Sequence, residues 1–172
     1  MHGGRLDPST RSPRGRPLKR ASAVPILCAA VGAAIASTVI ELLLWAMSGD
    51  DAVRNLLRDA RLTAAIVMGP RVLGAPGGFD PLVMGVATLV HAVLSLVYAA
   101  VLVRVIRHLS LGPALLAGDV FGLLLYGVNL YGFTTIFPWF TAVRDTITLI
   151  AHLMFGITAA AVYCVAQRHA TR

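Results

Sequence analysis

The chain has 172 residues, of which 57% are hydrophobic and only 13% are charged, and its formal net charge is +7. This composition excludes an ordinary soluble domain, whose apolar share is lower and whose charged share is about twice as high. We expect one membrane domain and no additional soluble domain, because four spans with short connections account for nearly the whole length.

Residues 1–22 form a basic leader rich in Arg, Pro, Ser and Gly. This composition is typical of disordered chain, and we expect the leader to be cytoplasmic and to lie against anionic lipid headgroups. Nucleic acid is not the expected partner, because no aromatic residues are interleaved with the basic residues of the leader.

The first apolar stretch, residues 24–47, exceeds the roughly 20 residues that a membrane-spanning helix needs, and it contains Glu41. Ala34 and Ala36 form the A-x-A pattern of a signal-peptide cleavage site. The apolar run continues well beyond these alanines, however, so we expect an uncleaved span.

The segment between the first two spans, residues 49–80, is predicted to contain an amphipathic helix. At helical spacing, Arg54, Arg58 and Arg61 gather on one side. The other side is apolar and consists of Val53, Leu56, Leu57, Ala60 and Ala64. This pattern is typical of a helix that lies in the membrane interface. Such a helix can anchor the chain to headgroups or act as a lid over the bundle, and the sequence leaves both interpretations open.

Three further apolar stretches, residues 81–104, 112–133 and 146–166, are predicted to span the membrane. The membrane domain then covers residues 23–167 and leaves a cytoplasmic tail, residues 168–172. The predicted fold class is all-α, a transmembrane four-helix bundle with an interfacial amphipathic helix between spans one and two.

Aromatic residues are concentrated in the connection between spans three and four, at the depth where span three leaves the membrane. Aromatic side chains at this depth are typical of an interfacial belt. The belt is predicted to consist of Tyr131, Phe133, Phe137, Trp139 and Phe140. Pro138 is expected to prevent the helix from continuing straight through the connection.

Basic residues are unevenly distributed between the two sides that four spans define. Ten of them lie in the leader, in the turn between spans two and three, and in the tail: Arg5, Arg11, Arg14, Arg16, Lys19, Arg20, Arg104, Arg107, Arg168 and Arg172. Five lie on the opposite side: Arg54, Arg58, Arg61, Arg71 and Arg144. Because the side richer in Lys and Arg faces the cytoplasm, both termini are predicted to be cytoplasmic.

The chain has the pattern of two repeated helical hairpins. A shift of 61 residues places His91 on His152 and the Arg-His pair at 107–108 on the Arg-His pair at 168–169. The first hairpin then differs from the second by an insertion of about 20 residues in its loop. Parallel repeats of this kind are one way in which transporters are built.

Four segments, taken in order, resemble a family of small, uncharacterised bacterial inner-membrane proteins with four spans: RDARLTAAIVMG, LVHAVLSLVYA, GLLLYGVNLYGFTTIFPWF and TLIAHLMFG. The resemblance covers residues 42–163 and leaves the basic leader outside. It implies a four-span fold in the bacterial inner (plasma) membrane. Some relatives carry the label sodium:proline symporter, which this sequence does not support, because such symporters have many more spans.

Each span carries one ionisable residue near its middle, and three of these residues lie at similar depth. At 1.5 Å per residue, Glu41, His91 and His152, together with Asn129, lie within about 9 Å of their span midpoints on the outer side. They are predicted to form an intramembrane polar cluster. Asp119 lies about 6 Å from its midpoint on the cytoplasmic side and is a candidate relay there.

Small and polar residues at three- and four-residue spacing are predicted to face one another inside the bundle, because close backbone approach drives helix contact in lipid. These positions are Ser37 and Glu41; Thr88, His91 and Ser95; Gly118 and Gly122; and His152 and Gly156. We also expect Glu41 to pair directly with His152, since a carboxylate in hydrocarbon must be protonated, paired or hydrated.

Three functional hypotheses follow. In the first, the chain is a transport or proton-relay element in which Glu41, His91 and His152 exchange protons and Asp119 continues the path inward, in a possible homo-oligomer. In the second, it is a structural or assembly protein whose polar groups fix helix packing. In the third, it is a redox protein whose histidines bind haem or a metal. Since no CxxCH, HExxH or catalytic triad is present, we expect no cofactor, no metal and no enzymatic activity.

Overall fold

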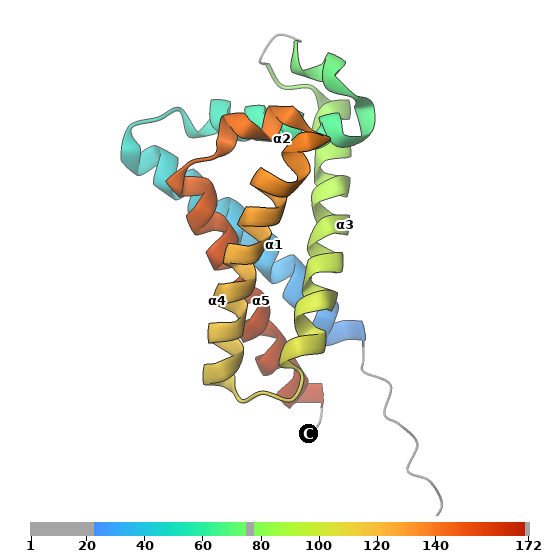
Figure 1. Ribbon diagram of the computed structural model, residues 1–172, viewed down its shortest axis with the longest axis vertical. Helices are drawn as coiled ribbons and strands as arrows, with labels where there is room; N and C mark the ends of the chain where they lie inside the picture. Colours follow the sequence, from blue (N-terminus) through green and yellow to red (C-terminus); the bar gives the residue numbers. More distant parts are fainter. Residues whose placement is uncertain (1–22, 75–77, 171–172) are drawn as a thin grey trace, which may run out of the picture.

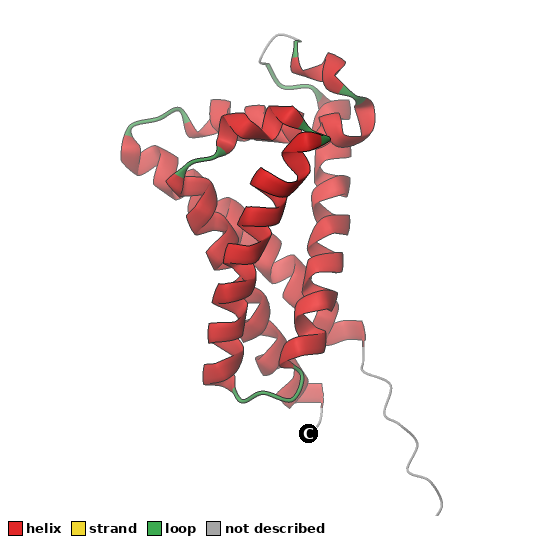
Figure 2. Cartoon of the chain, in the orientation of Figure 1, coloured by secondary structure: helices red, strands yellow, loops and turns green. Residues whose placement is uncertain are grey.

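The described part of the chain, residues 23–74 and 78–170 of the computed structural model, contains helices and no strand (Figure 1, Figure 2). The α-helices are α1 (Ala23–Ser48), α2 (Ala52–Met68), α3 (Pro81–Ile106), α4 (Leu111–Gly127) and α5 (Thr146–Ala170). Shorter helical turns connect them: η1 (Pro70–Leu73), η2 (Val128–Gly132), η3 (Phe133–Thr135) and η4 (Pro138–Val143). The predicted all-α fold is confirmed, whereas the predictions for the basic leader concern residues outside the described ones.

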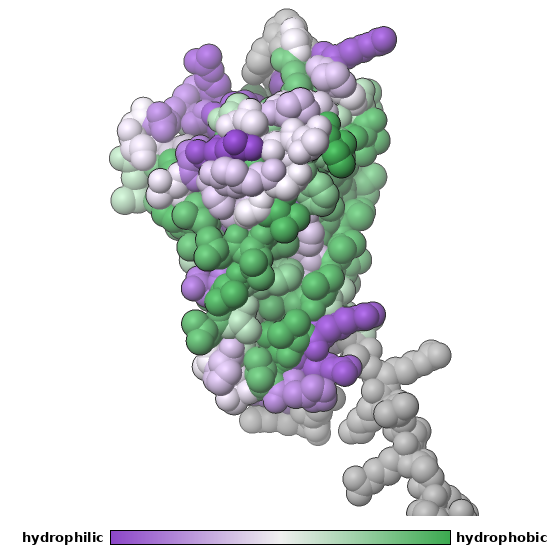
Figure 3. Space-filling view, viewed as in Figure 1, coloured by the Kyte–Doolittle hydropathy of each residue, from purple (hydrophilic) through white to green (hydrophobic). Residues whose placement is uncertain are grey.

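Four of these helices are long and apolar enough to cross a membrane: α1, α3, α4 with its continuation to Thr135, and α5. Each predicted span lies within one of them. Hydrophobic side chains dominate the flank of the bundle in Figure 3, and hydrophilic ones gather toward its two ends. The chain is therefore a multi-pass membrane protein with a four-helix bundle.

Residues that end and begin helices separate α2 from the spans on either side. Gly49 and Gly69 follow α1 and α2 with φ angles of 79° and 80°, a left-handed conformation that favours glycine. Asp51 and Asp80 precede α2 and α3, and their carboxylates accept backbone N–H hydrogen bonds of 3.0 and 2.9 Å. The amphipathic helix predicted in this segment is therefore a distinct element.

The membrane helices alternate in direction. The beginning of α1, the turn between α3 and α4, and the end of α5 lie together at one end of the bundle, and α2 and η4 lie at the other (Figure 1). We refer to these as the terminal end and the α2 end. The two ends of the membrane domain therefore lie at the same end of the bundle.

Three glycines bring the backbones of α4 and α5 into direct contact. A Cβ atom added to Gly118 would overlap with the backbone of Gly156, and one added to Gly122 would overlap with the backbone of His152. A Cβ atom on Gly156 would in turn overlap with the Gly118 carbonyl. Small residues four positions apart permit this approach between membrane helices. The predicted facing of these glycines is confirmed.

Helix α3 is less closely packed than the other membrane helices. Both α1 and α4 pack along α5, whereas α3 packs mainly against α1 and α2 and meets α4 and α5 at few positions. Within the two predicted hairpins, α1 and α3 are therefore less closely packed than α4 and α5. Helix α2 lies across the loosely packed side of α3. There Leu62 packs against Leu130 and Val143, and Ala64 packs against Val83. The space that remains below α2 forms a cavity.

One of the three arginines on the basic side of α2 is buried. Arg61, expected on the solvated side, is only 8% exposed and donates hydrogen bonds to the carbonyls of Val72, at 3.3 Å, and Gly78, at 2.6 Å. Arg61 is buried because of a tertiary contact, in which backbone carbonyls of the segment after α2 lie against its guanidinium group. A side chain with several N–H donors satisfies these acceptors.

Candidate functional site

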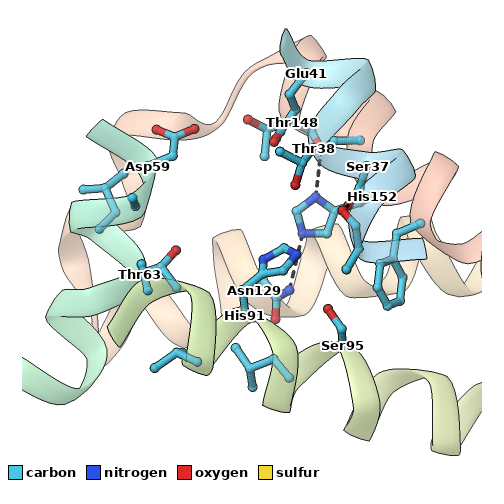
Figure 4. A pocket seen from close by; sticks show the side chains of 18 of the residues that line it. Ser37, Thr38, Glu41, Asp59, Thr63, His91, Ser95, Asn129, Thr148 and His152 are labelled. Carbon is cyan, nitrogen blue, oxygen red and sulfur yellow. Dashed lines mark hydrogen bonds between the residues drawn. The ribbon is translucent and has the colours of Figure 1, made fainter. Parts of the chain in front are cut away.

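A cavity of about 690 Å³ lies between the membrane helices at the α2 end (Figure 4). All five α-helices contribute to its wall, which is mostly apolar. Its polar side chains are Ser37, Thr38, Glu41, Asp59, Thr63, Thr88, His91, Ser95, Tyr98, Asn129, Thr148 and His152. A largely apolar pocket of about 300–1,000 Å³ with a few convergent polar groups is typical of small-molecule sites.

The four residues predicted to cluster, Glu41, His91, Asn129 and His152, all line this cavity. Asp119 does not line it. It precedes Asn129 on the same span by about 15 Å along the helix axis, toward the terminal end. The structure therefore brings the predicted cluster together and leaves Asp119 apart from it, and a relay role for Asp119 stays a prediction.

A chain of hydrogen bonds links three elements at the cavity wall. The Tyr98 hydroxyl of α3 donates to Asn129 Oδ1 at 2.8 Å, and Asn129 Nδ2 lies 3.3 Å from His152 Nε2 of α5. His152 Nδ1 lies 2.8 Å from the Thr148 carbonyl. Because a carbonyl only accepts and an amide nitrogen only donates, His152 is neutral with its proton on Nδ1. This chain joins α3, η2 and α5.

Asn129 reaches the cavity from a π-helical turn, an element that the sequence pattern does not predict. In η2 the Phe133 N–H donates to the Val128 carbonyl five residues earlier, so the turn is wider than in an α-helix. Such turns occur frequently at functional sites in other proteins. Glycines at both ends of the turn, Gly127 and Gly132, are the only local signal for it.

The expected direct pair between Glu41 and His152 is not formed. Both ring nitrogens of His152 have other partners, namely Asn129 and the Thr148 carbonyl. Within the described residues, no hydrogen bond or ion pair engages the Glu41 carboxyl group, which lines the cavity. In Figure 4 it lies beside Thr38 and Thr148, away from His91.

His91 is the second ionisable group of the predicted cluster that faces the cavity without a hydrogen bond to a described residue. Figure 4 shows its ring next to Asn129, on the α3 side. Its side chain is exposed, but into the cavity whose wall it forms. Glu41 and His91 therefore present protonatable atoms to the cavity from opposite walls, while His152 is held in the wall by its partners.

Helix α2 adds a carboxyl group to the cavity, Asp59, whose Oδ1 accepts a hydrogen bond from Arg58 Nε at 2.7 Å. Burial raises the pKa of Asp59, because it favours the neutral acid over the carboxylate, and the hydrogen bond and charge of Arg58 oppose this rise only in part. Burial alone would lower the pKa of Arg58, but the hydrogen bond to Asp59 and the nearby negative charges raise it. The helical pattern does not single out Asp59, since a charged residue on an amphipathic helix is expected to face water.

The aromatic residues predicted as an interfacial belt divide into two groups. Tyr131 is 56% exposed, and its ring lies 4.3 Å from the guanidinium of Arg144. Trp139 packs against α2, where its Nε1 donates to the Leu62 carbonyl at 3.0 Å. The three phenylalanines all line the cavity: Phe133, Phe137 and Phe140. A membrane-interface role stays a prediction, and the structure adds a part in closing the α2 end.

Three or more His, Cys, Asp or Glu side chains placed to hold a metal ion are not found together within residues 23–74 and 78–170. His152 is also unsuited to ligate haem or a metal, because both of its nitrogens are engaged in hydrogen bonds. Comparison of the chain with family models, curated proteins and solved structures finds no match.

Proposed function

We propose that this chain is a transport element that takes a small solute into the cavity below α2 and links its movement to proton binding by Glu41 and His91. The observation that carries the proposal is a cavity of about 690 Å³ into which a carboxyl and an imidazole project without hydrogen-bond partners among the described residues. Ionisable groups inside a membrane domain are costly to keep and generally mark ion, proton or substrate paths.

A purely structural role is the second candidate, and it is favoured for a different set of residues. Polar groups that only fix helix packing are expected to bond to one another and to leave little space, which describes Tyr98, Asn129 and His152. Glu41 and His91 do not follow this pattern. We therefore assign packing to the hydrogen-bonded three, and proton binding to Glu41 and His91.

We also propose that the chain is a member of the four-span bacterial inner-membrane family that its segments resemble, with both termini in the cytoplasm. The excess of Lys and Arg at the terminal end supports this orientation, which places the cavity and α2 toward the outer side. A reporter fused after Arg172 is then expected to behave as cytoplasmic. Alkaline phosphatase activity from that fusion would contradict the orientation.

The proton-binding role predicts that the purified protein dissipates a pH gradient imposed across liposomes faster than empty liposomes do. Glu41→Gln is expected to slow this flux roughly tenfold or more, because an amide cannot take up and release the proton. The control is Asp50→Asn, which neutralises an exposed carboxyl group that lies outside the cavity and has no part in the proposed proton path. We expect this control to retain the wild-type rate.

Two results would overturn the proposal. One is a wild-type flux no faster than the leak of empty liposomes. The other is an equal loss of flux in Glu41→Gln and Asp50→Asn, which would show that the cavity has no special part. Gel filtration and the thermal midpoint of each variant show whether a loss of flux reflects misfolding.

A further inference from the structure

We infer that the α2 end of the cavity binds the protonated amine of an amphipathic organic cation and that the apolar wall holds its hydrophobic part. This inference rests on the proposed function and names the class of solute that the cavity accepts. It depends on three features of the site: an excess of negative charge, a buried hydroxyl without a partner, and an apolar and aromatic wall.

The charges around the α2 end are predominantly negative. Glu41 and Asp59 line the cavity from α1 and α2, and Asp145, which precedes α5, is close enough for its charge to act on both. The positive charge that acts on Glu41 and Asp59 is that of Arg58, which is already hydrogen-bonded to Asp59. An entering cation therefore favours the ionised form of Glu41 and pairs with a carboxyl group that has no hydrogen bond or ion pair among the described residues.

Thr148 supplies an independent sign of a missing ligand. Its side chain is 6% exposed, and its hydroxyl has no hydrogen-bond partner within the described residues although it lines the cavity. Its backbone is fixed at both ends, since its N–H donates to Asp145 Oδ1 at 2.8 Å and its carbonyl bonds to His152. In Figure 4 the side chain lies beside Glu41 and points toward the Asp59 side of the cavity.

A buried hydroxyl without a partner is rare and costly, so a ligand atom that bonds to it is expected. An ammonium group suits both the Thr148 hydroxyl and the neighbouring Glu41 carboxyl group. It offers several N–H donors and no acceptor, so one donor can reach the Thr148 hydroxyl oxygen while another reaches the Glu41 carboxylate. A carboxylate or phosphate group would instead meet the negative charges of Glu41 and Asp59.

The remainder of the wall suits an apolar body attached to the amine. Leu94 of α3 and Leu125 of α4 form part of it, and the rings of Phe133, Phe137 and Phe140 close it toward the connection before α5. Aromatic rings also attract cations through their faces. A small hydrophilic cation would leave most of this wall in contact with water, whereas an amphipathic amine covers it.

The test uses the full-length protein in nanodiscs of zwitterionic phosphatidylcholine and measures binding by isothermal titration calorimetry. The probe is 4-phenylbutylammonium, and its neutral counterpart with the same skeleton is 4-phenylbutanol. We expect the ammonium to bind about tenfold more tightly than the alcohol, after subtraction of binding to empty nanodiscs, because hydrogen bonds to a charged group are stronger than those to a neutral one. Equal affinity of the two probes for the wild-type protein would overturn the inference without recourse to any variant.

Variants then locate the site. Glu41→Gln is expected to remove most of the preference for the ammonium, and Thr148→Val, which keeps the side-chain shape, to weaken ammonium binding about fivefold. Asp119→Asn is the control that leaves the preference intact. If Asp119→Asn removes the preference and Glu41→Gln keeps it, the assignment to this cavity is wrong.

The inference and the proposed function can fail separately. A wild-type protein that dissipates a pH gradient but does not distinguish the two probes keeps the proton-binding role and loses the amine. A protein that prefers the ammonium but moves no protons keeps the binding site and loses the transport role.

Discussion

Replacing Gly156 with alanine should lower the free energy of unfolding by about 3 kcal/mol, the upper part of the range for overpacked sites. The new methyl group would overlap with the carbonyl of Gly118 on α4, which is backbone and cannot turn aside as a side chain can. The two helices must then separate along their shared face, which removes close contacts that replace the hydrophobic drive in lipid. Denaturant unfolding in detergent micelles measures the change.

The matched control for this variant is Gly85→Ala in α3. A Cβ atom at Gly85 meets nothing within 4 Å, so its alanine is expected to be neutral or to stabilise the helix by up to about 1 kcal/mol. If Gly156→Ala unfolds at the same denaturant concentration as Gly85→Ala, the close approach of α4 and α5 is wrong.

Replacing Asn129 with leucine should lower the free energy of unfolding by about 1–3 kcal/mol, because two partners lose their hydrogen bonds inside the bundle. The Tyr98 hydroxyl loses its acceptor and His152 Nε2 loses its donor. Tyr98→Phe removes only the first of these bonds and should cost less, at most about 1.5 kcal/mol. Unfolding in the same detergent gives both values.

The double variant decides whether these residues act as one network. Once Asn129 is leucine, the Tyr98 hydroxyl has already lost its acceptor, so Tyr98→Phe should cost little in that background. Costs that simply add would show that the two residues stabilise the bundle independently, contrary to the hydrogen-bonded chain in the structure.

The sequence by itself determined the number of membrane helices, their ends and the depth of the polar cluster. The length of an apolar run decides whether a helix crosses a membrane, and residues such as Gly49, Asp51 and Asp80 start and stop helices through local geometry. Depth follows from counting residues along a helix, so Glu41, His91, Asn129 and His152 could be placed together before their contacts were known.

Side-chain partners depended on the tertiary structure, because depth specifies the height of a residue and not the direction in which it faces its neighbours. His152 could have reached Glu41 or Asn129 at similar depth, and the rotation of α5 against η2 selects Asn129. The same applies to α2, whose charged residues are expected in water when the helix is considered alone. Its docking across the loosely packed side of α3 brings Asp59 to the cavity, and the loop that follows covers Arg61. These contacts join residues that are distant in the chain, and no local pattern encodes them.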